Sequence, residues 1–409
     1  MMRYVSMLLL ALAMVQFAFV ALPPGNADLI SVQSLALDLS RGDKTWLYPG
    51  EDFASNDDWV MHHEANLRQL NDKGYANWCF YPPLIPYLVS PWAAVGAETW
   101  RLVWAGIQFA LIALFVALIE RVIHDGRSGS VRNRLLICAL VLGSCPLAKS
   151  VSLGQTSLLV AVLLWAGFLS GNRTGGLRKA LAVGAAVFVK PFLLLVEAAD
   201  LARRRWRLAL AVFAAFAAWL ILSVLAVGWQ AHAGYWHLLT TLASSQTAYF
   251  GNQSLVAGLM RVFSDLPVMD YGFQQGGSLA VINRSLAALI LLGTMLIQWR
   301  APQTDERASF GLWISAGLLA LPISWEHHFV FLLPVIAFLW TRSWSRLGFA
   351  ALTLATLLME AAWFGLYGDR GISRVAANLP LLGNVILFVL LMTLHRPASQ
   401  LAASDSQRI

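Results

Sequence analysis

Residues 23–48, PPGNADLISVQSLALDLSRGDKTWLY, begin the polar segment that interrupts an otherwise apolar chain. The whole segment runs from Pro23 to Pro83, carries nine acidic residues against four basic ones, and ends in WCFYPP. One apolar run precedes it, and almost everything after it is compatible with lipid. A large acidic loop between apolar runs, with Asp28 at its root, suggests chemistry at one face of a membrane.

The composition of the 409 residues indicates an integral membrane protein. Hydrophobic residues make up 58% of the chain and charged residues 12%, and the mean hydropathy is +0.63, whereas soluble domains carry about 25% charged residues. The net charge of +7 is spread over short basic clusters between apolar runs. Such clusters are typical of orientation signals in the membrane rather than of nucleic-acid binding. We therefore expect one integral membrane domain over residues 1–409 and no nucleic-acid partner.

The N-terminal apolar run, residues 4–22, is about long enough to span a bilayer. We interpret it as an uncleaved first transmembrane helix, with a signal peptide cut within residues 23–27 as the alternative. The three cysteines, Cys79, Cys138 and Cys145, lack metal-site spacing, so neither a disulfide nor a zinc site is expected from them.

The rest of the chain predicts an all-α polytopic protein with 11–13 membrane helices. Residues 28–41 have apolar positions at helical spacing, which predicts an amphipathic helix on the membrane surface. Residues 81–95 are short and broken by prolines, as in a re-entrant or interfacial helix. Several later apolar runs are also short, and short helices are tolerated where they line an enclosed cavity.

The positions of lysine and arginine predict the orientation. With a cytoplasmic N-terminus, most of the 29 basic residues fall inside. The first loop (23–83) and a second long polar loop (228–278) then lie on the extracytoplasmic side of the plasma (inner) membrane. Both flanks of residues 177–201 are basic, so the chain should turn back at Lys190-Pro191, with the tip of this hairpin outside.

This topology places the unusual polar residues on the same face. Ionisable residues at membrane depth are costly and usually face a cavity or a function. The set comprises Asp28, Tyr81, Gln155 after Gly154, Lys190, Asn252 and Gln253 in GNQS (251–254), and Glu326, His327 and His328 in SWEHH (324–328).

Each of these residues also has a simpler interpretation. Asp28 would favour the start of a helix as an N-terminal acid, and Lys190 would extend to the interface. Residues 154–155 would form only a turn, GNQS would cap the following helix, and Tyr81 would belong to an aromatic belt. Adjacent histidines point apart on a helix and no third ligand has sensible spacing, so no metal is expected at His327-His328.

As a set, these residues suit transfer from a phosphorylated lipid. A carboxylate at the rim of a cavity can act as a general base for a hydroxyl nucleophile. A lysine and a histidine nearby can bind a phosphate and stabilise it as it leaves. Apolar grooves beside a phosphate site indicate a lipid-linked phosphate.

At these residues the chain resembles the bacterial polyprenol-phosphate-mannose-dependent α-(1→2) mannosyltransferases, glycosyltransferase family 87 of the GT-C superfamily. The resemblance covers most of the chain. It is carried by the order and spacing of several stretches: Asp28, Gly42 to Tyr48, Tyr81 to Leu84 with Pro91, Gly154 to Ser157, Lys190-Pro191 with residues 203–207, Gly251 to Leu255 with Arg261, and Pro322 to His328.

The resemblance implies a GT-C fold and an inverting transfer of mannose from a polyprenyl-phosphate donor to a lipid-anchored or extracytoplasmic glycan acceptor. It assigns Asp28 as the catalytic base. The family also has a histidine just before an apolar run, which corresponds to His327 or His328 in this chain. Lys190 and that histidine would hold the phosphate, and Gln155 and the 251–254 turn would line the sugar pocket, with Tyr81 and Glu326 beside them.

Two departures from the family pattern affect the acceptor and the base. Residues 29–32 lack the aromatic residue usual after the Asp, and Asp57 and Asp58 lie farther into a longer loop, so Asp58 is kept as a lesser candidate base. Because the leaving group is already an activated phosphate, no metal or cofactor is expected. The alternatives are the same scaffold with another lipid-linked sugar, such as arabinofuranose or a hexose, and a lipid-linked-glycan flippase.

Overall fold

The structure is a computed structural model, and it describes residues 2–21, 27–49, 57–72, 79–124, 130–170, 176–302, 304–361, 365 and 367–395. Within these ranges the protein is helical apart from two short strands, β1 (Ser245–Gln246) and β2 (Gln274–Gln275), which pair antiparallel. The chain forms two compact units, each assembled from separate stretches of sequence. We describe each unit by itself.

The first unit comprises residues 1–118, 130–191 and 213–244. Two of its helices, α5 (Ala97–His124) and α11 (Trp206–Val227), continue into the second unit. Its other elements are α1 (Met2–Ala21), α2 (Ala27–Ser40), α3 (Asp57–Gln69), α4 (Leu84–Val89), the 3-10 helix η1 (Ser90–Trp92), α6 (Val131–Leu142), α7 (Cys145–Ser152), α8 (Ser157–Ser170), α9 (Leu177–Val189) and α12 (Trp229–Ser244).

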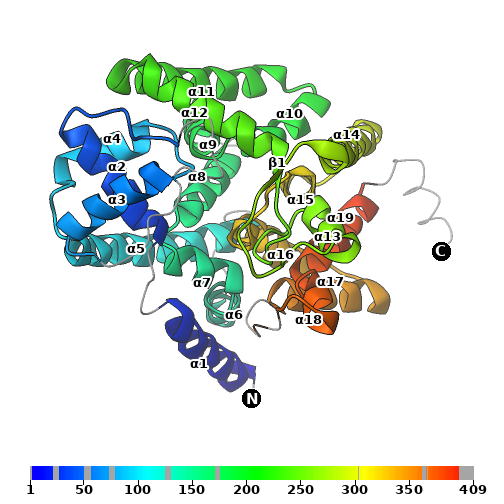
Figure 1. The fold of residues 1–409 in the computed structure, drawn as a ribbon. Helices are drawn as coiled ribbons and strands as arrows, with labels where there is room; N and C mark the ends of the chain where they lie inside the picture. The colour runs from blue at the N-terminus through cyan, green and yellow to red at the C-terminus, as the bar shows by residue number, and fades with distance from the viewer. Residues whose placement is uncertain are drawn as a thin grey trace, which may run out of the picture. The chain divides into compact units, whose positions relative to one another are not determined.

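Helices α2, α3 and α4 and the 3-10 helix η1 form a small helical cluster in this unit (Figure 1, blue). Helix α2 packs against α3, α4 and η1. The core between them holds Ile30, Ala36 and Leu37 of α2 with Leu67 of α3 and Ala93 beyond η1. This packing places both ends of α2 in fixed surroundings, which matters for the polar residues described below.

The expectation of an amphipathic surface helix over residues 28–41 is wrong. In α2 every residue from Leu29 to Asp38 is buried, the polar ones included. Neighbouring segments supply hydrogen-bond partners for several of these polar groups: Gln33 Nε2 donates to the carbonyl oxygens of Ala93 at 3.2 Å and Val95 at 2.5 Å. Buried polar groups with such partners cost little, so α2 is an internal helix rather than an interfacial one.

The prolines of residues 81–95 divide this stretch as the sequence indicates. It forms α4 and η1, two short pieces of 6 and 3 residues. Likewise α9 ends at Val189, and the chain continues beyond Lys190 as η2, so the predicted break at Lys190-Pro191 is present. That the 177–201 pair forms a hairpin with its tip outside stays a prediction.

The second unit comprises residues 119–129, 192–212 and 245–409. Helix α15 is buried along its whole apolar length, from Ala308 to Ala320, and packs against α14 and α19. Its elements besides the strands are η2 (Pro191–Glu197), α10 (Ala198–Ala202), α13 (Leu255–Phe263), α14 (Gly277–Arg300), α15 (Glu306–Ala320), η3 (Glu326–Leu332), α16 (Leu333–Trp340), α17 (Arg346–Met359), α18 (Gly371–Ala376) and α19 (Leu379–Thr393).

A close helix pair closes this unit at its C-terminal end. Helices α17 and α19 lie side by side, and Gly383 of α19 makes their close approach possible: a Cβ there would lie 2.7 Å from the Ala355 carbonyl oxygen. A larger residue would have to push the two backbones apart, as is usual for small residues at the contacts of apolar helices.

Three helices of the described residues are long and apolar enough to cross a membrane: α5, α11 and α14. The bent pair α6 and α7 adds a fourth if it counts as one span. Five further apolar helices are 10–17 residues long, among them Ser157–Ser170 and Leu379–Thr393. The expected 11–13 crossings therefore depend on helices shorter than a full span, and that number stays a prediction.

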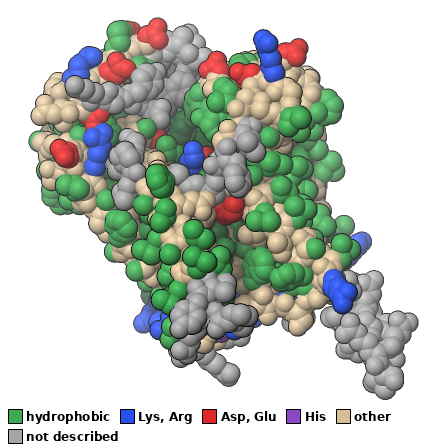
Figure 2. Space-filling view, turned by 90° about the horizontal axis from the view of Figure 1, so that it is seen from below, with side chains coloured by type: hydrophobic (Ala, Val, Ile, Leu, Met, Phe, Trp, Pro, Cys, Tyr) green, Lys and Arg blue, Asp and Glu red, His purple; other side chains and the backbone are tan. Residues whose placement is uncertain are grey.

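Large hydrophobic side chains are exposed on the long apolar helices, as lipid contact requires. On α11 they include Ile221 and Leu225, and on α14 Leu289 and Leu292. Figure 2 shows one face of the molecule on which hydrophobic side chains are abundant and charged ones sparse. A soluble monomer rarely exposes so much apolar surface, so the protein is a multi-pass membrane protein.

Candidate active site

Asp28 lies at the start of α2, where a backbone hydrogen bond joins it to a segment distant in the sequence. Its amide N–H donates to the carbonyl oxygen of Leu153 at 3.1 Å, just beyond the end of α7. An acid in the first turn of a helix also interacts favourably with the helix dipole, which is the simple explanation for its presence. That explanation does not account for the side-chain contacts that follow.

The carboxylate of Asp28 accepts a hydrogen bond from the side-chain amide of Gln155, 127 residues further along the chain. Gln155 follows Gly154, whose φ of +70° is the left-handed conformation that glycine adopts most easily. The backbone carbonyl of Gln155 accepts from Gln108 Nε2 of α5 at 2.9 Å. The turn at residues 154–155 thus has a specific shape that points the amide at Asp28.

Tyr81 determines which way the Gln155 amide faces. Its hydroxyl donates to Gln155 Oε1 at 2.6 Å and accepts from the Thr156 N–H at 3.3 Å. Burial, together with the nearby charge of Asp28, raises the pKa of Tyr81, so the hydroxyl stays protonated and remains a donor. With Oε1 accepting, the NH₂ group of Gln155 is the end that faces the carboxylate.

Tyr48 supports this arrangement from behind. Its hydroxyl donates to the Tyr81 carbonyl oxygen at 2.7 Å, and its ring packs on Tyr235 of α12 with centroids 5.4 Å apart. Burial raises the pKa of the neighbouring Cys79 thiol to about 12, so Cys79 is an unreactive core residue.

Lys190 completes the group. It lies between α9 and η2, outside the candidate spans, and is half-buried. Burial lowers the pKa of Lys190 to about 8, and the charge of Asp28 opposes that shift. The carboxylate is therefore near enough to favour the ammonium form. We call Asp28, Tyr81, Gln155 and Lys190 the Asp28 cluster; all four belong to the first unit.

The other predicted residues belong to the second unit. Glu326, His327 and His328 form the first turn of η3 and are buried. The two imidazoles contact each other edge to face, with centroids 4.7 Å apart. His328 also packs on the rings of Phe192 at 5.5 Å and Phe331 at 6.0 Å. His328 is thus enclosed by aromatic rings on more than one side.

Asn252 and Gln253 are fully buried, and their amides bind backbone groups. Asn252 Nδ2 donates to the carbonyl oxygens of Thr247 and Pro322, and its Oδ1 accepts from the N–H groups of Ser254 and Ser324. Gln253 Nε2 donates to Phe250 and Ala377, and its Oε1 accepts from the Leu381 N–H.

These bonds join the 251–254 turn to the segment before η3. Asn252 forms a β-bridge with Trp325, and the Glu326 N–H donates to the Gly251 carbonyl at 2.9 Å. Asn252 and Gln253 therefore position Glu326 and the histidines. Contact of the two amides with a substrate stays a prediction.

Among the candidate bases, Asp58 has different surroundings. It is exposed in the first turn of α3, where an acid favours the helix start. The Asp28 carboxylate differs from it, because an amide orients it and the charge of a lysine acts on it.

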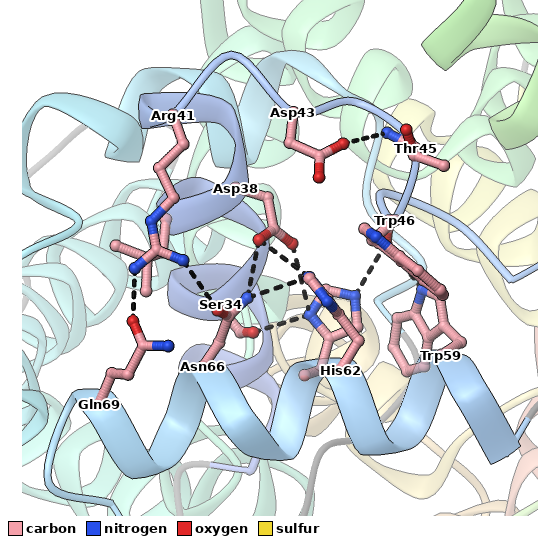
Figure 3. Close-up of polar contacts among 12 residues, drawn as sticks. Ser34, Asp38, Arg41, Asp43, Thr45, Trp46, Trp59, His62, Asn66 and Gln69 are labelled. Atoms are coloured by element: carbon pink, nitrogen blue, oxygen red, sulfur yellow. Dashed lines mark hydrogen bonds and ion pairs between the residues drawn. The ribbon is translucent and has the colours of Figure 1, made fainter.

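A second polar cluster lies at the other end of α2, and it was not singled out from the sequence (Figure 3). It contains Asp38 of α2 with His62, His63 and Asn66 of α3. A signal was present: Ser34 and Asp38 on one helix, and His62 and Asn66 on another, are four residues apart and share a helix face.

The fold and the Asp28 cluster define a helical membrane protein with a carboxylate oriented by a distant amide. More specifically, the chain belongs to glycosyltransferase family 87, whose model matches residues 78–324, more than half of the chain. The matched range contains Tyr81, Gln155, Lys190, Asn252 and Gln253, whereas Asp28 and residues 326–328 lie outside it.

A curated relative points to the same family. Over 268 residues the chain is 27% identical to the polyprenol-phosphate-mannose-dependent alpha-(1-2)-phosphatidylinositol pentamannoside mannosyltransferase of Mycolicibacterium smegmatis. The match covers 62% of this chain and 61% of the relative. No solved structure matches the chain.

Proposed function

We propose that the protein is an inverting glycosyltransferase that moves a sugar, mannose, from a polyprenyl-phosphate donor to a lipid-anchored or extracytoplasmic glycan acceptor. Family membership and the name of the relative support the reaction class and the donor. The observation that carries the proposal for this chain is the Asp28 carboxylate held by Gln155, with Lys190 nearby.

In the proposed step, a hydroxyl oxygen of the acceptor attacks the anomeric carbon of the donor sugar. The bond between that carbon and the phosphate oxygen breaks, its electron pair leaves with the polyprenyl phosphate, and the configuration inverts. The hydroxyl proton passes to the Asp28 carboxylate. General-base assistance of this kind contributes about 10²–10⁴-fold to the rate.

Gln155 and Tyr81 act as positioning residues in this proposal. A general base must lie within hydrogen-bond reach of the proton it takes. The amide of Gln155 limits the rotation of the carboxylate, and the Tyr81 hydroxyl prevents that amide from turning over. Both groups stay uncharged, so they orient the carboxylate without protonating it.

Lys190 is proposed to bind the donor phosphate. The leaving polyprenyl phosphate gains negative charge as the sugar bond breaks, and an ammonium group stabilises that charge. A half-buried position strengthens this interaction relative to one in water, because the surrounding dielectric constant is lower.

For the second unit we propose that His327 contacts a phosphate and that Glu326 assists it. The support is chemical: imidazole is a donor to phosphate when protonated, and the 251–254 turn gives this segment a defined backbone. The surroundings of His328, between two phenylalanine rings, favour a packing role for it instead.

The test is a transfer assay with full-length protein in lipid nanodiscs. Polyprenyl phosphate carrying radiolabelled mannose is supplied with extracted glycolipid acceptors, and labelled products are mapped by linkage. Parallel reactions with the arabinofuranose and glucose donors decide the sugar. Label transfer by the wild type that is absent in Asp28→Asn supports the proposal. Movement of intact donor across the membrane without transfer would point to a flippase and overturn it.

A further inference from the structure

The second polar cluster, which we call the Asp38 cluster, lies at the end of α2 away from Asp28. Three of its residues have the arrangement of a metal site. Asp38, His62 and His63 each offer a ligand atom, and these atoms lie within 4.8 Å of one another. Asp28 and Asp38 are ten positions apart on one helix, which corresponds to about 15 Å along its axis. The cluster is therefore separate from the proposed site of sugar transfer.

We propose that Asp38, His62 and His63 bind a divalent transition-metal ion, zinc in the first instance, and that this ion joins α2 to α3. Two imidazoles and one carboxylate are a common ligand set for zinc, with a further position taken by water. Two nitrogen ligands and one oxygen ligand also suit zinc and the neighbouring transition metals better than calcium or magnesium, which prefer oxygen ligands.

The spacing of the ligand atoms fits such an ion. Bonds of about 2.0–2.1 Å at tetrahedral angles place ligand atoms about 3.4 Å apart. In the structure His62 Nε2 lies 3.0 Å from Asp38 Oδ1, and His63 Nδ1 lies 3.8 Å from Asp38 Oδ2. The two contacts go to different oxygens of the carboxylate, and the three ligand atoms all lie within 4.8 Å of one another. Rotation of the side chains would bring them to the coordination distances.

The two histidines converge although they are neighbours in the sequence. They present different ring nitrogens, Nε2 from His62 and Nδ1 from His63, and their rings are nearly perpendicular at 89°. Adjacent side chains on a helix point about 100° apart. The use of opposite nitrogens lets both rings reach Asp38, His62 at Oδ1 and His63 at Oδ2.

The hydrogen bonds around His63 give it the tautomer that a ligand needs. Its Nε2 lies 2.8 Å from the carbonyl oxygen of Trp46, which can only accept, so Nε2 carries the hydrogen and Nδ1 keeps its lone pair. Metal-bound histidines usually donate their second ring N–H in this way.

Asp38 is held in the same manner. It is 1% exposed, and its Oδ1 accepts from Asn66 Nδ2 at 2.8 Å. Its Oδ2 is buried, and among the described residues it has no hydrogen-bond donor. A buried carboxylate oxygen without a donor costs free energy unless something else satisfies it. A cation bound between Oδ2 and the two imidazoles would satisfy it.

Ser34 allows a metal site to be separated from a simple hydrogen-bond network. Its hydroxyl lies 2.7 Å from His63 Nδ1 and donates to it, so it occupies the lone pair that a metal would use. Removing this hydroxyl frees the nitrogen without removing a ligand. A purely structural network would lose a bond, whereas a metal site would lose a competitor.

The experiment uses the full-length protein in nanodiscs, purified through a tag that contains no histidine. Chelator-treated protein is titrated with cobalt(II), whose visible absorption reports coordination, and with zinc in competition. The variants are Asp38→Asn, His63→Gln and Ser34→Ala, and His237→Gln of α12 is the control for an unrelated histidine. Thermal unfolding is recorded for each variant with and without zinc.

We expect one equivalent of metal in the wild type and in His237→Gln, with affinity kept or increased in Ser34→Ala. Asp38→Asn and His63→Gln should weaken binding at least about 100-fold, given that even the partners of ligands contribute about 10–100-fold. Zinc should raise the unfolding temperature of the wild type and of Ser34→Ala, which bind the metal. It should not raise that of the variants that have lost binding. Stoichiometric binding that Asp38→Asn and His63→Gln leave unchanged, or no binding by folded wild type, overturns the proposal.

Discussion

The Tyr81 hydroxyl donates to the side-chain carbonyl oxygen of Gln155 at 2.6 Å, and this bond turns the amide of Gln155 toward the Asp28 carboxylate. The two residues are 74 positions apart in the chain, and together they orient the side chain of a third residue, Asp28. The position of the proposed base is thus controlled by a phenol and an amide, neither of which takes up charge.

Asp28→Asn should abolish sugar transfer with little effect on folding. The substitution keeps the shape of the side chain and its ability to accept from Gln155, but an amide cannot take the acceptor's proton. We expect a decrease in kcat of about 10²–10⁴-fold, measured with the radiolabelled donor. The matched control is Asp58→Asn, at an exposed acid. An Asp28→Asn protein with wild-type turnover and an unchanged unfolding temperature would falsify the base assignment.

Tyr81→Phe should lower kcat more than it changes KM. Without the hydroxyl, the Gln155 amide can turn over and present its oxygen to the carboxylate, which repels it. A neutral hydrogen bond contributes about 0.5–1.5 kcal/mol, so we expect roughly a tenfold loss of kcat. Tyr48→Phe removes a hydroxyl from the same core and serves as the comparison. An equal effect of both substitutions on kcat would mean that Tyr81 acts only through packing.

The activity should fall as the pH rises through about 8, because the phosphate partner Lys190 loses its proton with a pKa of about 8. Stability should change in the opposite direction. The folded-state pKa lies below the ordinary value of 10.5, so the unfolded chain binds more protons between these two values, and the contribution of Lys190 to stability increases with pH there.

Lys190→Arg tests this assignment, since an arginine stays charged throughout that range. Its pH–activity profile should lose the decline near pH 8, whatever its absolute rate. If the decline persists in Lys190→Arg, another group is responsible for it. Rates and unfolding temperatures measured over the same buffers separate the two opposite trends.

His327→Gln and His328→Gln should differ in kind. His328 contacts the rings of Phe192 and Phe331, so replacing it should lower the unfolding temperature. His327→Gln should leave stability closer to that of the wild type and raise the KM for the donor or lower kcat. The reverse pattern, with His328→Gln stable but inactive, would move the proposed phosphate contact to His328.

Arg261→Met should destabilise the second unit strongly. The guanidinium is 1% exposed and donates to Asn378 Oδ1 at 2.6 Å and to the backbone carbonyls of Tyr249 and Asn252. Asn378 Oδ1 and the Asn252 carbonyl would each lose this donor in the interior, at a cost of about 1–3 kcal/mol per group. Arg370→Met, at an exposed arginine, should stay within about 0.5 kcal/mol. Unfolding curves monitored by tryptophan fluorescence compare the two.

Several features of the fold followed from local sequence. The prolines at positions 82, 83, 86 and 91 divide residues 81–95 into short pieces, because proline removes a donor and restricts its neighbours. Lys190-Pro191 likewise ends α9 at Val189. The apolar length of α5, α11 and α14 is visible in the sequence itself. Each of these is a property of a single stretch.

Helix α2 shows where local reasoning fails. Its leucines and valines repeat at helical spacing, which predicts one apolar face and one wet face. The polar face is buried nonetheless, because Ala93 and Val95 accept from Gln33, and α3 supplies partners for Ser34 and Asp38. Whether a polar residue faces water or a protein partner depends on segments that are distant in the sequence. The residues next to it do not reveal where those segments will pack.

The sequence alone determined that this is a helical membrane protein, that it has a polar segment with an acid at its root, and which residue types are available for phosphate-linked chemistry. Tertiary structure decided that Asp28, Gln155 and Tyr81 meet and that the charge of Asp28 acts on Lys190. It also decided that Asn252 and Gln253 bind backbone groups and that Asp38, His62 and His63 converge. The physical reason is range: hydropathy and proline act on a residue and its neighbours, whereas a hydrogen bond across 127 positions exists only once the chain has folded.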